Sequence, residues 1–200
     1  MAFYALFCLA CVLPVSVLGN AARAGTQACL DLTPQHGAVA QSSTSPYMLS
    51  VDTTSITQGG MVTVTLNATT AGTTFRGFLV QARCTKCTTA DTAIVPGTFA
   101  KYTASDDTIQ TMDCENDAMN SMSHKGNDDK TSAKFTWKAP ADFDVTEGIQ
   151  FRATVVQVRV TWWTDIRSDE ITVTASSTSQ VAPVLTLAVL SFIAVSSLLP

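Results

Sequence analysis

The sequence predicts an all-β protein folded as an antiparallel β-sandwich, and three observations favour this class. Several short segments alternate apolar and polar residues, which is the pattern of strands buried on one face. Seven or eight such segments are separated by polar turns, as in a two-sheet sandwich. No amphipathic helix is evident between Gly25 and Thr174, and this span of about 150 residues is long enough for one domain with its own core.

The first half of the domain contains three expected strands. A polar, proline-containing segment at 31–46 should run along the edge of the sandwich, and a short strand is expected at 47–51. A glycine turn then leads into 61–67, where valine and leucine alternate with threonine. Residues 74–83 are apolar in both frames, which places this strand in the middle of a sheet. Gly77 within it predicts a bulge or a close backbone approach.

The second half is organised around residues 108–140. This stretch begins with a short strand that ends at Cys114 and continues as a polar loop carrying His124 and Lys130. It ends in a half-buried strand whose apolar face includes Trp137, and the proline that follows should stop this strand. We expect the loop and the buried tryptophan to fix the two sheets against each other.

The remaining strands lie on either side of that stretch. A brief edge strand is expected at 97–102. Residues 149–163 form the longest β run, and their apolar frame changes within the run, which predicts a bulge near Val155 or Val156. A last short strand is expected at 170–174.

The N-terminal end of the chain carries an apolar run typical of a secretory signal. Residues 1–19 are predicted to be a signal peptide, with cleavage between residues 19 and 24. The mature chain would then begin between Asn20 and Gly25, and the folded domain should occupy residues 25–174.

The C-terminal end carries a second apolar run. Residues 175–183 have the small residues and polar spacer of a GPI-attachment site, with Ser176 as the expected attachment residue, and residues 184–200 have the hydrophobic tail of a GPI signal. Two alternatives stay open, a short membrane-spanning tail and a loosely held secreted form.

Four of the six cysteines lie in the predicted domain, namely Cys29, Cys84, Cys87 and Cys114. In an extracellular protein they should be oxidised, with three connectivities. We favour Cys29 with Cys114 and Cys84 with Cys87, because the first bridge closes a long loop worth roughly 4–5 kcal/mol on the chain-entropy model. A redox role for the CxxC motif is disfavoured, since such a pair needs a helix N-terminus and this one lies in a Thr-rich β-loop.

Composition and charge exclude several function classes. The formal net charge is −4, and every charged residue lies between Arg23 and Glu170, which argues against nucleic-acid binding.

Asn67 begins the only N-glycosylation sequon, on the polar side of a strand end. We expect no cofactor.

No metal site is predicted either. Cys84, Cys87, His36 and His124 lack the spacing of a zinc site. The acidic residues from Asp113 onward fail the EF-hand pattern, which requires a glycine and a glutamate at fixed positions. A looser calcium site stays open, formed by Asp113, Asp117, Asp128 and Asp129, with a solvated acidic loop as the alternative.

Several ordered motifs resemble the reeler (reelin N-terminal) domain. They are GGMVTVTLNA at 59–68, FRGFLVQAR at 75–83, GTF at 97–99, the strand ending in Cys114, NSMSHKGNDDKTSAKFTWKAP at 120–140, and IQFRATVVQ at 149–157 with a tryptophan pair downstream. The resemblance covers about residues 29–173. It implies an immunoglobulin-like β-sandwich, an extracellular place and a role in innate immune defence.

The resemblance also bears on the cysteines and on the chain ends. The pairing of Cys29 with Cys114 matches the bridge expected of the family. The chain departs from the family pattern at Cys84 and Cys87 and in its C-terminal anchor signal, which is not typical of the secreted defence proteins of this family.

Five residues are candidates for binding: Trp162, Trp163, Arg159, His124 and Lys130. The two tryptophans point to opposite faces of a strand, so one should lie in the core and the other should be exposed beside Arg159, ready to contact a sugar or a protein. The alternative is a tryptophan packed on an arginine stem. No nucleophile motif accompanies His124 and Lys130, so we expect them to support the fold, and we predict no catalytic residue.

These observations favour a non-enzymatic recognition protein, anchored on the outer face of the plasma membrane or secreted. Its expected partner is a microbial surface glycolipid or polysaccharide, or a host surface protein, in innate immune defence. The alternative is a cell-adhesion or extracellular-matrix module. A redox accessory domain is the third hypothesis, motivated by the CxxC motif and by the reductase-like members of the family.

Overall fold

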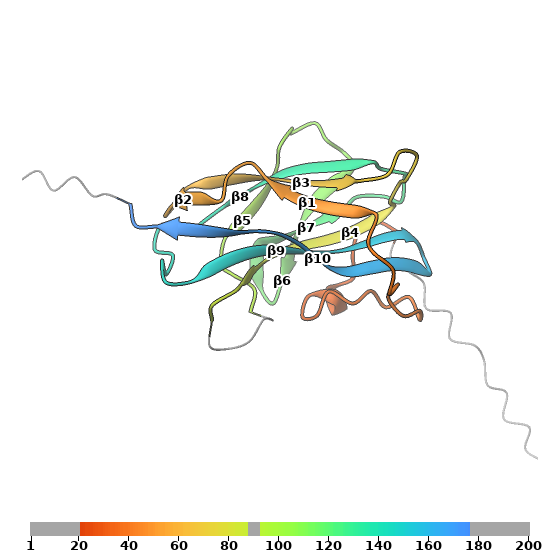
Figure 1. Cartoon of the computed structure of the whole chain (residues 1–200), viewed down its shortest axis with the longest axis horizontal. Helices are drawn as coiled ribbons and strands as arrows, with labels where there is room; N and C mark the ends of the chain where they lie inside the picture. The colour runs from red at the N-terminus through yellow and green to blue at the C-terminus, as the bar shows by residue number, and fades with distance from the viewer. Residues whose placement is uncertain (1–20, 88–92, 177–200) are drawn as a thin grey trace, which may run out of the picture.

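The structure is a computed structural model that describes residues 21–87 and 93–176. These residues form two β-sheets and one short 3-10 helix (Figure 1). In chain order the elements are η1 (Thr26–Ala28), β1 (Tyr47–Val51), β2 (Ser55–Thr57), β3 (Met61–Ala68), β4 (Gly77–Cys84), β5 (Thr98–Lys101), β6 (Ile109–Cys114), β7 (Asp117–His124), β8 (Ser132–Lys138), β9 (Gly148–Val158) and β10 (Thr161–Thr174).

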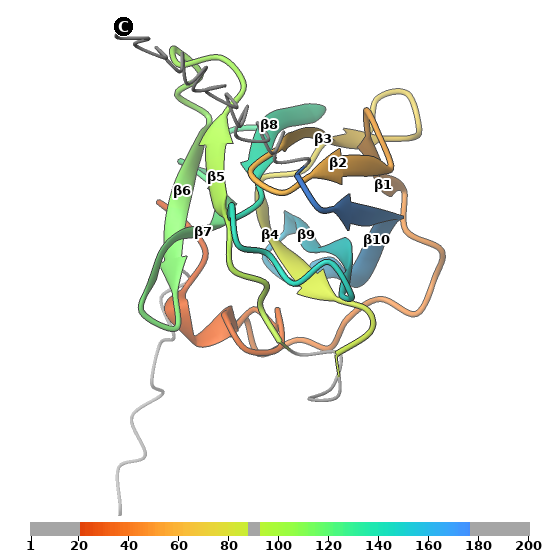
Figure 2. The ribbon, with the colours of Figure 1, turned by 90° about the vertical axis from the view of Figure 1, so that its left-hand side faces the viewer.

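The two sheets pack face to face as a sandwich. One sheet has four strands in the order β1-β3-β8-β5, and the other has six in the order β2-β10-β9-β4-β7-β6. Along one side β5 lies beside β6 and β7, which closes the sandwich there (Figure 2). The predicted all-β sandwich is confirmed. It is not wholly antiparallel, because the edge strand β2 pairs in parallel with the end of β10.

The core between the sheets comes from the strands whose alternation is clearest in the sequence. On β3 the side chains of Val62, Val64 and Leu66 are buried, and on β8 those of Phe135 and Trp137 are fully buried. Aromatic rings from both sheets interlock there, mostly edge to face or tilted. Both expected strands are therefore confirmed.

The prediction of a polar loop after Cys114 is wrong for residues 117–124, which form strand β7. The strand lacks apolar alternation because its polar side chains are buried with partners. Asn120 accepts a hydrogen bond from the Cys114 amide at 2.9 Å and donates one to the Cys114 carbonyl at 2.8 Å. Ser121 accepts a bond from buried Gln81 at 3.1 Å. Satisfied polar groups can occupy a sheet interior that a hydropathy pattern assigns to a loop.

The long run at 149–163 is also corrected, because it is a hairpin of β9 and β10 rather than one strand. The turn lies at Arg159 and Val160. Next to it the register shifts by one residue, since Thr161 pairs with Val158 and Trp162 pairs with Val156. The frame change in the sequence thus marks the approach to a turn. β10 then continues to Thr174 and includes the short strand expected at 170–174.

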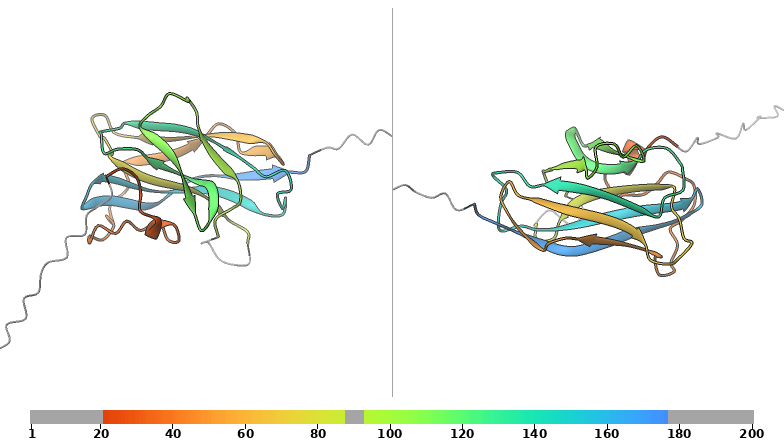
Figure 3. Two further views of the ribbon diagram at one scale, coloured as in Figure 1. Left: turned by 180° about the vertical axis from the view of Figure 1, so that it is seen from behind. Right: turned by 90° about the horizontal axis from the view of Figure 1, so that it is seen from above.

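The N-terminal segment, residues 21–46, first lies over the outer face of the six-stranded sheet (Figures 1 and 3). It then follows the sandwich edge, as predicted for its second part, where the Gln41 amide donates to the Trp162 carbonyl at 2.8 Å. The Cys29–Cys114 disulfide ties it to β6. Arg83 of β4 is buried and donates hydrogen bonds to the carbonyls of Cys29 at 2.8 Å and Leu30 at 2.9 Å. The pKa of Arg83 is lowered to about 10, mainly because burial disfavours the charged form and secondly because the neighbouring Arg152 carries a like charge.

This third layer explains the burial of β4. All eight of its residues are buried, because one face meets the four-stranded sheet and the other meets the N-terminal segment. Leu79 on the outer face packs with Ala28, Leu32 and the disulfide. The apolar pattern in both frames of this strand correctly predicted a central position.

Tyr47 gives a pH-dependent test of this packing. Its buried hydroxyl donates to the Thr74 carbonyl at 2.7 Å, and burial raises the pKa of Tyr47 to about 12. We expect Tyr47→Phe to lower the free energy of unfolding by about 1 kcal/mol at neutral pH, since one hydrogen bond is lost. The unfolded tyrosine has a pKa of about 10, so the tyrosine contribution is complete below that pH and is lost as the pH rises through 12.

The measurement is urea unfolding of the wild-type protein and Tyr47→Phe at pH values from 7 to 12. The difference in unfolding free energy should shrink above pH 10. A difference that stays constant across the range would show that the hydroxyl is solvated in the folded protein.

Candidate functional site

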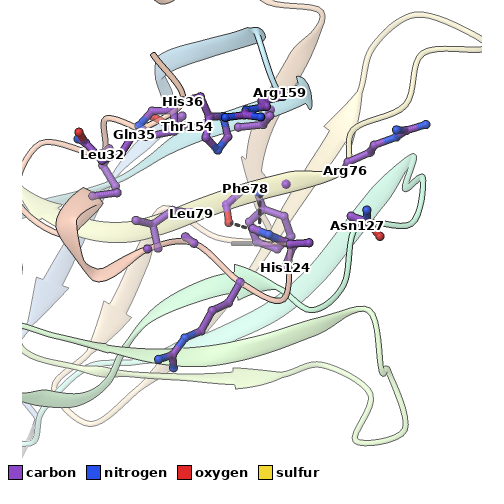
Figure 4. Close-up of a pocket in the computed structure, with 18 of the residues that line it drawn as sticks. Leu32, Gln35, His36, Arg76, Phe78, Leu79, His124, Asn127, Thr154 and Arg159 are labelled. Carbon is purple, nitrogen blue, oxygen red and sulfur yellow. Dashed lines mark hydrogen bonds between the residues drawn. The ribbon is translucent and has the colours of Figure 1, made fainter. Parts of the chain in front are cut away.

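A cavity of about 570 Å³ lies on the outer face of the six-stranded sheet (Figure 4). The N-terminal segment forms one wall, and β4, β7 and β9 form the floor and the opposite wall. Most of the surface is apolar, with Ala24, Leu32, Phe78, Leu79 and Val156 among the lining residues. Its volume falls within the range of sites that hold small molecules.

The floor of the cavity depends on Gly77 and His124. A Cβ atom on Gly77 would lie 3.3 Å from Cε1 of His124 and 3.5 Å from Cβ of Val156, so the close backbone approach predicted at this glycine is confirmed. Nδ1 of His124 lies 3.1 Å from both the amide nitrogen and the carbonyl oxygen of Phe78. The β4–β7 pairing ends at Leu79, so the imidazole takes the place of a backbone partner for Phe78.

The charged groups of the cavity are all cationic. Among the described residues Arg23, Arg76 and Arg159 line it, together with two histidines, and no carboxylate does so. Arg76 is paired with Asp129 at 2.8 Å and extends away from the middle of the cavity (Figure 4). The hydrogen bond from Arg76 lowers the pKa of Asp129. Arg23 and Arg159 also line the cavity and carry positive charge, in a chain of net charge −4.

His36 adds a polar group that the fold leaves unsatisfied. Its Nδ1 is buried and has no hydrogen-bond partner within the described part of the chain. His36, Thr154 and Arg159 lie together along one side of the cavity (Figure 4). A buried acceptor or donor without a partner is costly, so this side is suited to a ligand with a polar end.

The prediction that one of the two tryptophans is exposed for contact with a sugar or a protein is wrong. Both Trp162 and Trp163 are buried, with relative exposures of 3% and 8%. The Trp162 indole donates to the Ala38 carbonyl at 3.2 Å, and the Trp163 indole donates to the Ser43 carbonyl at 3.1 Å. The N-terminal segment thus covers the tryptophan that was expected to be exposed. That segment is polar and aperiodic, so no residue pattern indicated that it covers this tryptophan.

The remaining candidate binding residues do not all lie at the cavity. Of the five, Arg159 and His124 line the cavity, and Lys130 does not. Lys130 is buried and donates to the carbonyls of Asp128 at 2.8 Å and Arg76 at 3.4 Å. Burial lowers the pKa of this lysine. It ties the loop after β7 to the start of β4 and supports the fold.

Both favoured disulfide pairings are present. Cys29 is bonded to Cys114, and Cys84 is bonded to Cys87. Cys84 is the last residue of β4, and among the described residues no helix lies beside it to activate a thiol. Glu147 lies close to Cys84 and Cys87, but disulfide sulfurs are not available as thiolate ligands for a metal.

Two of the four carboxylates considered for calcium already have partners. Asp113 accepts a hydrogen bond from the Met119 amide at 2.7 Å, and Asp129 is paired with Arg76. These contacts account for both groups without a cation.

The modification sites remain predictions. Asn67 is half-buried on β3, where it pairs with Met48 and Ser132. Ser176 is exposed, and its amide and hydroxyl donate to Gln58 at 3.2 and 3.0 Å. The predicted signal peptide 1–19 and the tail 184–200 lie outside the described residues. Within residues 21–87 and 93–176 we find no helix with the length and hydropathy needed to cross a membrane.

Comparison with known proteins places these features in a family. Residues 27–179 match the family model described as "Reeler domain". A Bombyx mori protein named "Putative defense protein" is 32% identical over 174 residues, which cover 84% of this chain and 96% of that protein. A Danio rerio protein named "Putative ferric-chelate reductase 1" is 34% identical over 76% of this chain, but the match spans only 25% of that protein.

A solved structure shares the fold. The human F-spondin reeler domain aligns with a TM-score of 0.52 at 21% identity, covering 68% of this chain and 93% of that one. The family model spans more than two thirds of the sequence, from just before Cys29 to beyond β10. This chain therefore belongs to the Reeler domain family.

Proposed function

We propose that this protein is a non-enzymatic recognition protein of innate defence, displayed on the cell surface or secreted, which binds microbial surface material. The observation that carries the proposal is the cavity of about 570 Å³ between the N-terminal segment and the six-stranded sheet. It occurs in a chain that matches a defence-named protein of Bombyx mori over most of both lengths. A largely apolar cavity with a few polar groups is the usual form of a ligand site.

The residues of the cavity support binding rather than catalysis. Covalent catalysis needs a nucleophile beside a base, and general acid–base chemistry needs titratable groups facing the substrate. Among the described residues the lining contains no serine, cysteine, lysine or carboxylate. The Nδ1 atom of His124 engages the backbone of Phe78, and Thr154 donates to Thr164 at 2.8 Å. His36 is the remaining titratable group other than arginine in the described lining, and one histidine without a second acid–base group favours binding over catalysis.

The position of the cavity suits a surface-displayed receptor. Arg159 lies at the turn before β10, and Ser176 follows the other end of that strand (Figure 1). β10 has 14 residues, so at about 3.3 Å per residue the two ends are roughly 45 Å apart along the strand. An anchor attached at Ser176 would hold the cavity toward the medium and away from the membrane.

The test uses mature protein purified from insect cells that express the full chain, and measures its binding to fluorescent bacteria. Val156→Phe places a larger side chain in the cavity, and Val145→Phe makes the same change in an exposed loop that does not line it. We expect the wild-type protein and Val145→Phe to bind alike and Val156→Phe to bind at least tenfold more weakly.

Two results would contradict this proposal. One is equal binding by Val156→Phe and the wild-type protein, and the other is wild-type binding no stronger than that of an unrelated β-sandwich. Aggregation of cells expressing the full chain, without binding to microbes, would favour the adhesion alternative.

A further inference from the structure

We propose that the ligand of this cavity is an anionic amphiphile. Its alkyl or isoprenoid chain would lie in the apolar interior, and its phosphate, sulfate or carboxylate would lie at the arginines of the rim. This inference names the ligand class for the site of the proposed function and rests on that function for the site's role.

The interior of the cavity is built for a hydrocarbon chain. Leu32 comes from the N-terminal segment and Leu79 from the outer face of β4. Val156 of β9 pairs with Gly77, and its side chain lines the floor beside this glycine. An alkyl chain placed against these groups would be stabilised by the hydrophobic effect, because apolar surface of both the chain and the cavity would be removed from water.

The rim favours an anion. Arg23 comes from the N-terminal segment and Arg159 from the turn between β9 and β10, so two different parts of the chain supply cations to the lining. His36 adds the buried Nδ1 atom without a partner in the described structure. No described carboxylate lines the cavity, so the lining itself would not repel an anionic head. Guanidinium groups bind phosphate and carboxylate through paired, charge-assisted hydrogen bonds.

A saccharide fits this site poorly. Sugar hydroxyls buried against apolar walls would lose their hydrogen bonds to water without compensation. Sugar rings also stack on exposed aromatic faces, and here Trp162 and Trp163 are covered while Phe78 has a relative exposure of 2%. Exposed Tyr102 already carries the Lys134 ammonium 3.8 Å from its ring centre. Of the ligand types predicted from the sequence, the amphiphile is favoured over the polysaccharide.

The experiment is calorimetric titration of the mature protein with single-chain probes below their micelle concentrations. Dodecyl phosphate and dodecanoate supply two anionic heads, dodecyl maltoside supplies an uncharged sugar head on the same chain, and inorganic phosphate supplies the anion alone. We expect both anionic probes to bind at least tenfold more tightly than dodecyl maltoside, and inorganic phosphate to bind at least a hundredfold more weakly than dodecyl phosphate.

Variants separate the two parts of the site. Val156→Phe should weaken every alkyl probe at least tenfold. Arg23→Gln and Arg159→Gln should each weaken dodecyl phosphate about three- to tenfold and leave dodecyl maltoside unchanged. Arg167→Gln is the matched control, because this exposed arginine of β10 pairs with Asp165 and does not line the cavity. Its affinities should equal those of the wild-type protein.

Equal affinity for charged and uncharged heads, or full affinity in Val156→Phe, would overturn the inference. The outcomes also separate it from the proposed function. Cavity-dependent binding of bacteria without binding of dodecyl phosphate would overturn the ligand class alone. Binding of dodecyl phosphate in the cavity without any binding of bacteria would overturn the defence role alone.

A second inference rests on the contacts of residues 22–24. The Ala22 carbonyl accepts hydrogen bonds from the Gln110 side chain at 2.7 Å and from the Gly126 amide at 3.3 Å. The Ala24 amide donates to the buried Ser123 hydroxyl at 2.9 Å. We infer that signal cleavage precedes Ala22, because a cut after Ala24 would remove these bonds and would take Arg23 from the cavity rim.

N-terminal sequencing and intact mass of the mature protein test this inference. A chain that begins at Asn20, Ala21 or Ala22 agrees with it. A chain that begins at Arg23, Ala24 or Gly25, or one that keeps Met1, would contradict it.

Discussion

Replacing both Cys29 and Cys114 with serine is expected to lower the free energy of unfolding by about 4–5 kcal/mol, the largest effect that the structure predicts. The bridge joins residues 85 positions apart, so its loss frees a long loop in the unfolded chain. It also fastens the N-terminal segment to β6, so the double variant should lose affinity for dodecyl phosphate as well. Urea unfolding at pH 7 gives the first quantity and calorimetry the second.

The second disulfide is the matched control. Cys84 and Cys87 are three positions apart, and on the same chain-entropy model their bridge is worth roughly 2 kcal/mol. Replacing both with serine should leave dodecyl phosphate binding unchanged, because neither residue lines the cavity. Equal losses of stability in the two double variants would show that the long bridge does not restrict the unfolded chain as described. Lost binding of bacteria by the Cys84 and Cys87 variant, with its fold intact, would contradict a purely structural role for this disulfide.

Trp137→Ala is expected to lower the free energy of unfolding by about 3–5 kcal/mol, because it empties the largest buried side-chain volume of the core. The indole ring meets Phe151 edge to face, with centroids 5.8 Å apart. The backbone of Gly97 packs directly against the ring, so that even a methyl group there would overlap it. Chemical denaturation at pH 7 measures the loss.

Trp137→Phe serves as the control for this prediction. The indole nitrogen of Trp137 is buried without a hydrogen-bond partner among the described residues, so phenylalanine removes volume without breaking a hydrogen bond. Its loss should be well below that of alanine. Equal losses for the two variants, or no measurable loss for alanine, would mean that this face of β8 does not point into the core.

The parts of the fold that follow a simple burial pattern were predictable from the sequence. β3 and β8 alternate cleanly because one face meets the core and the other meets solvent. β7 was missed because most of its buried side chains are polar and are satisfied by neighbours such as Cys114 and Gln81. The β9–β10 hairpin was missed because Arg159 and Val160 form its turn without glycine, proline or asparagine, the usual signals of a turn.

The cavity was predictable only in fragments. Arg159 and His124 were candidates, and the pairing of Cys29 with Cys114 was favoured, yet the position of the N-terminal segment was not foreseen. That segment is held by the disulfide and by hydrogen bonds from Arg83, and such contacts leave no periodic pattern. The signal that could have revealed it is the polar pair Gln81 and Arg83 on the outer frame of a central strand, because buried polar groups there need a covering layer that supplies partners.

The most direct test of the central claim, that this cavity is the ligand site, is photoaffinity labelling of the mature protein. The probe is an alkyl phosphate with a diazirine in its chain, and the adducts are located by peptide mass spectrometry. We predict adducts on peptides that contain Leu32, Leu79 and Val156, reduced by Val156→Phe and by competing dodecyl phosphate. Adducts centred instead on the exposed Met48 and Met61 of the four-stranded sheet, or spread evenly along the chain, would contradict the claim.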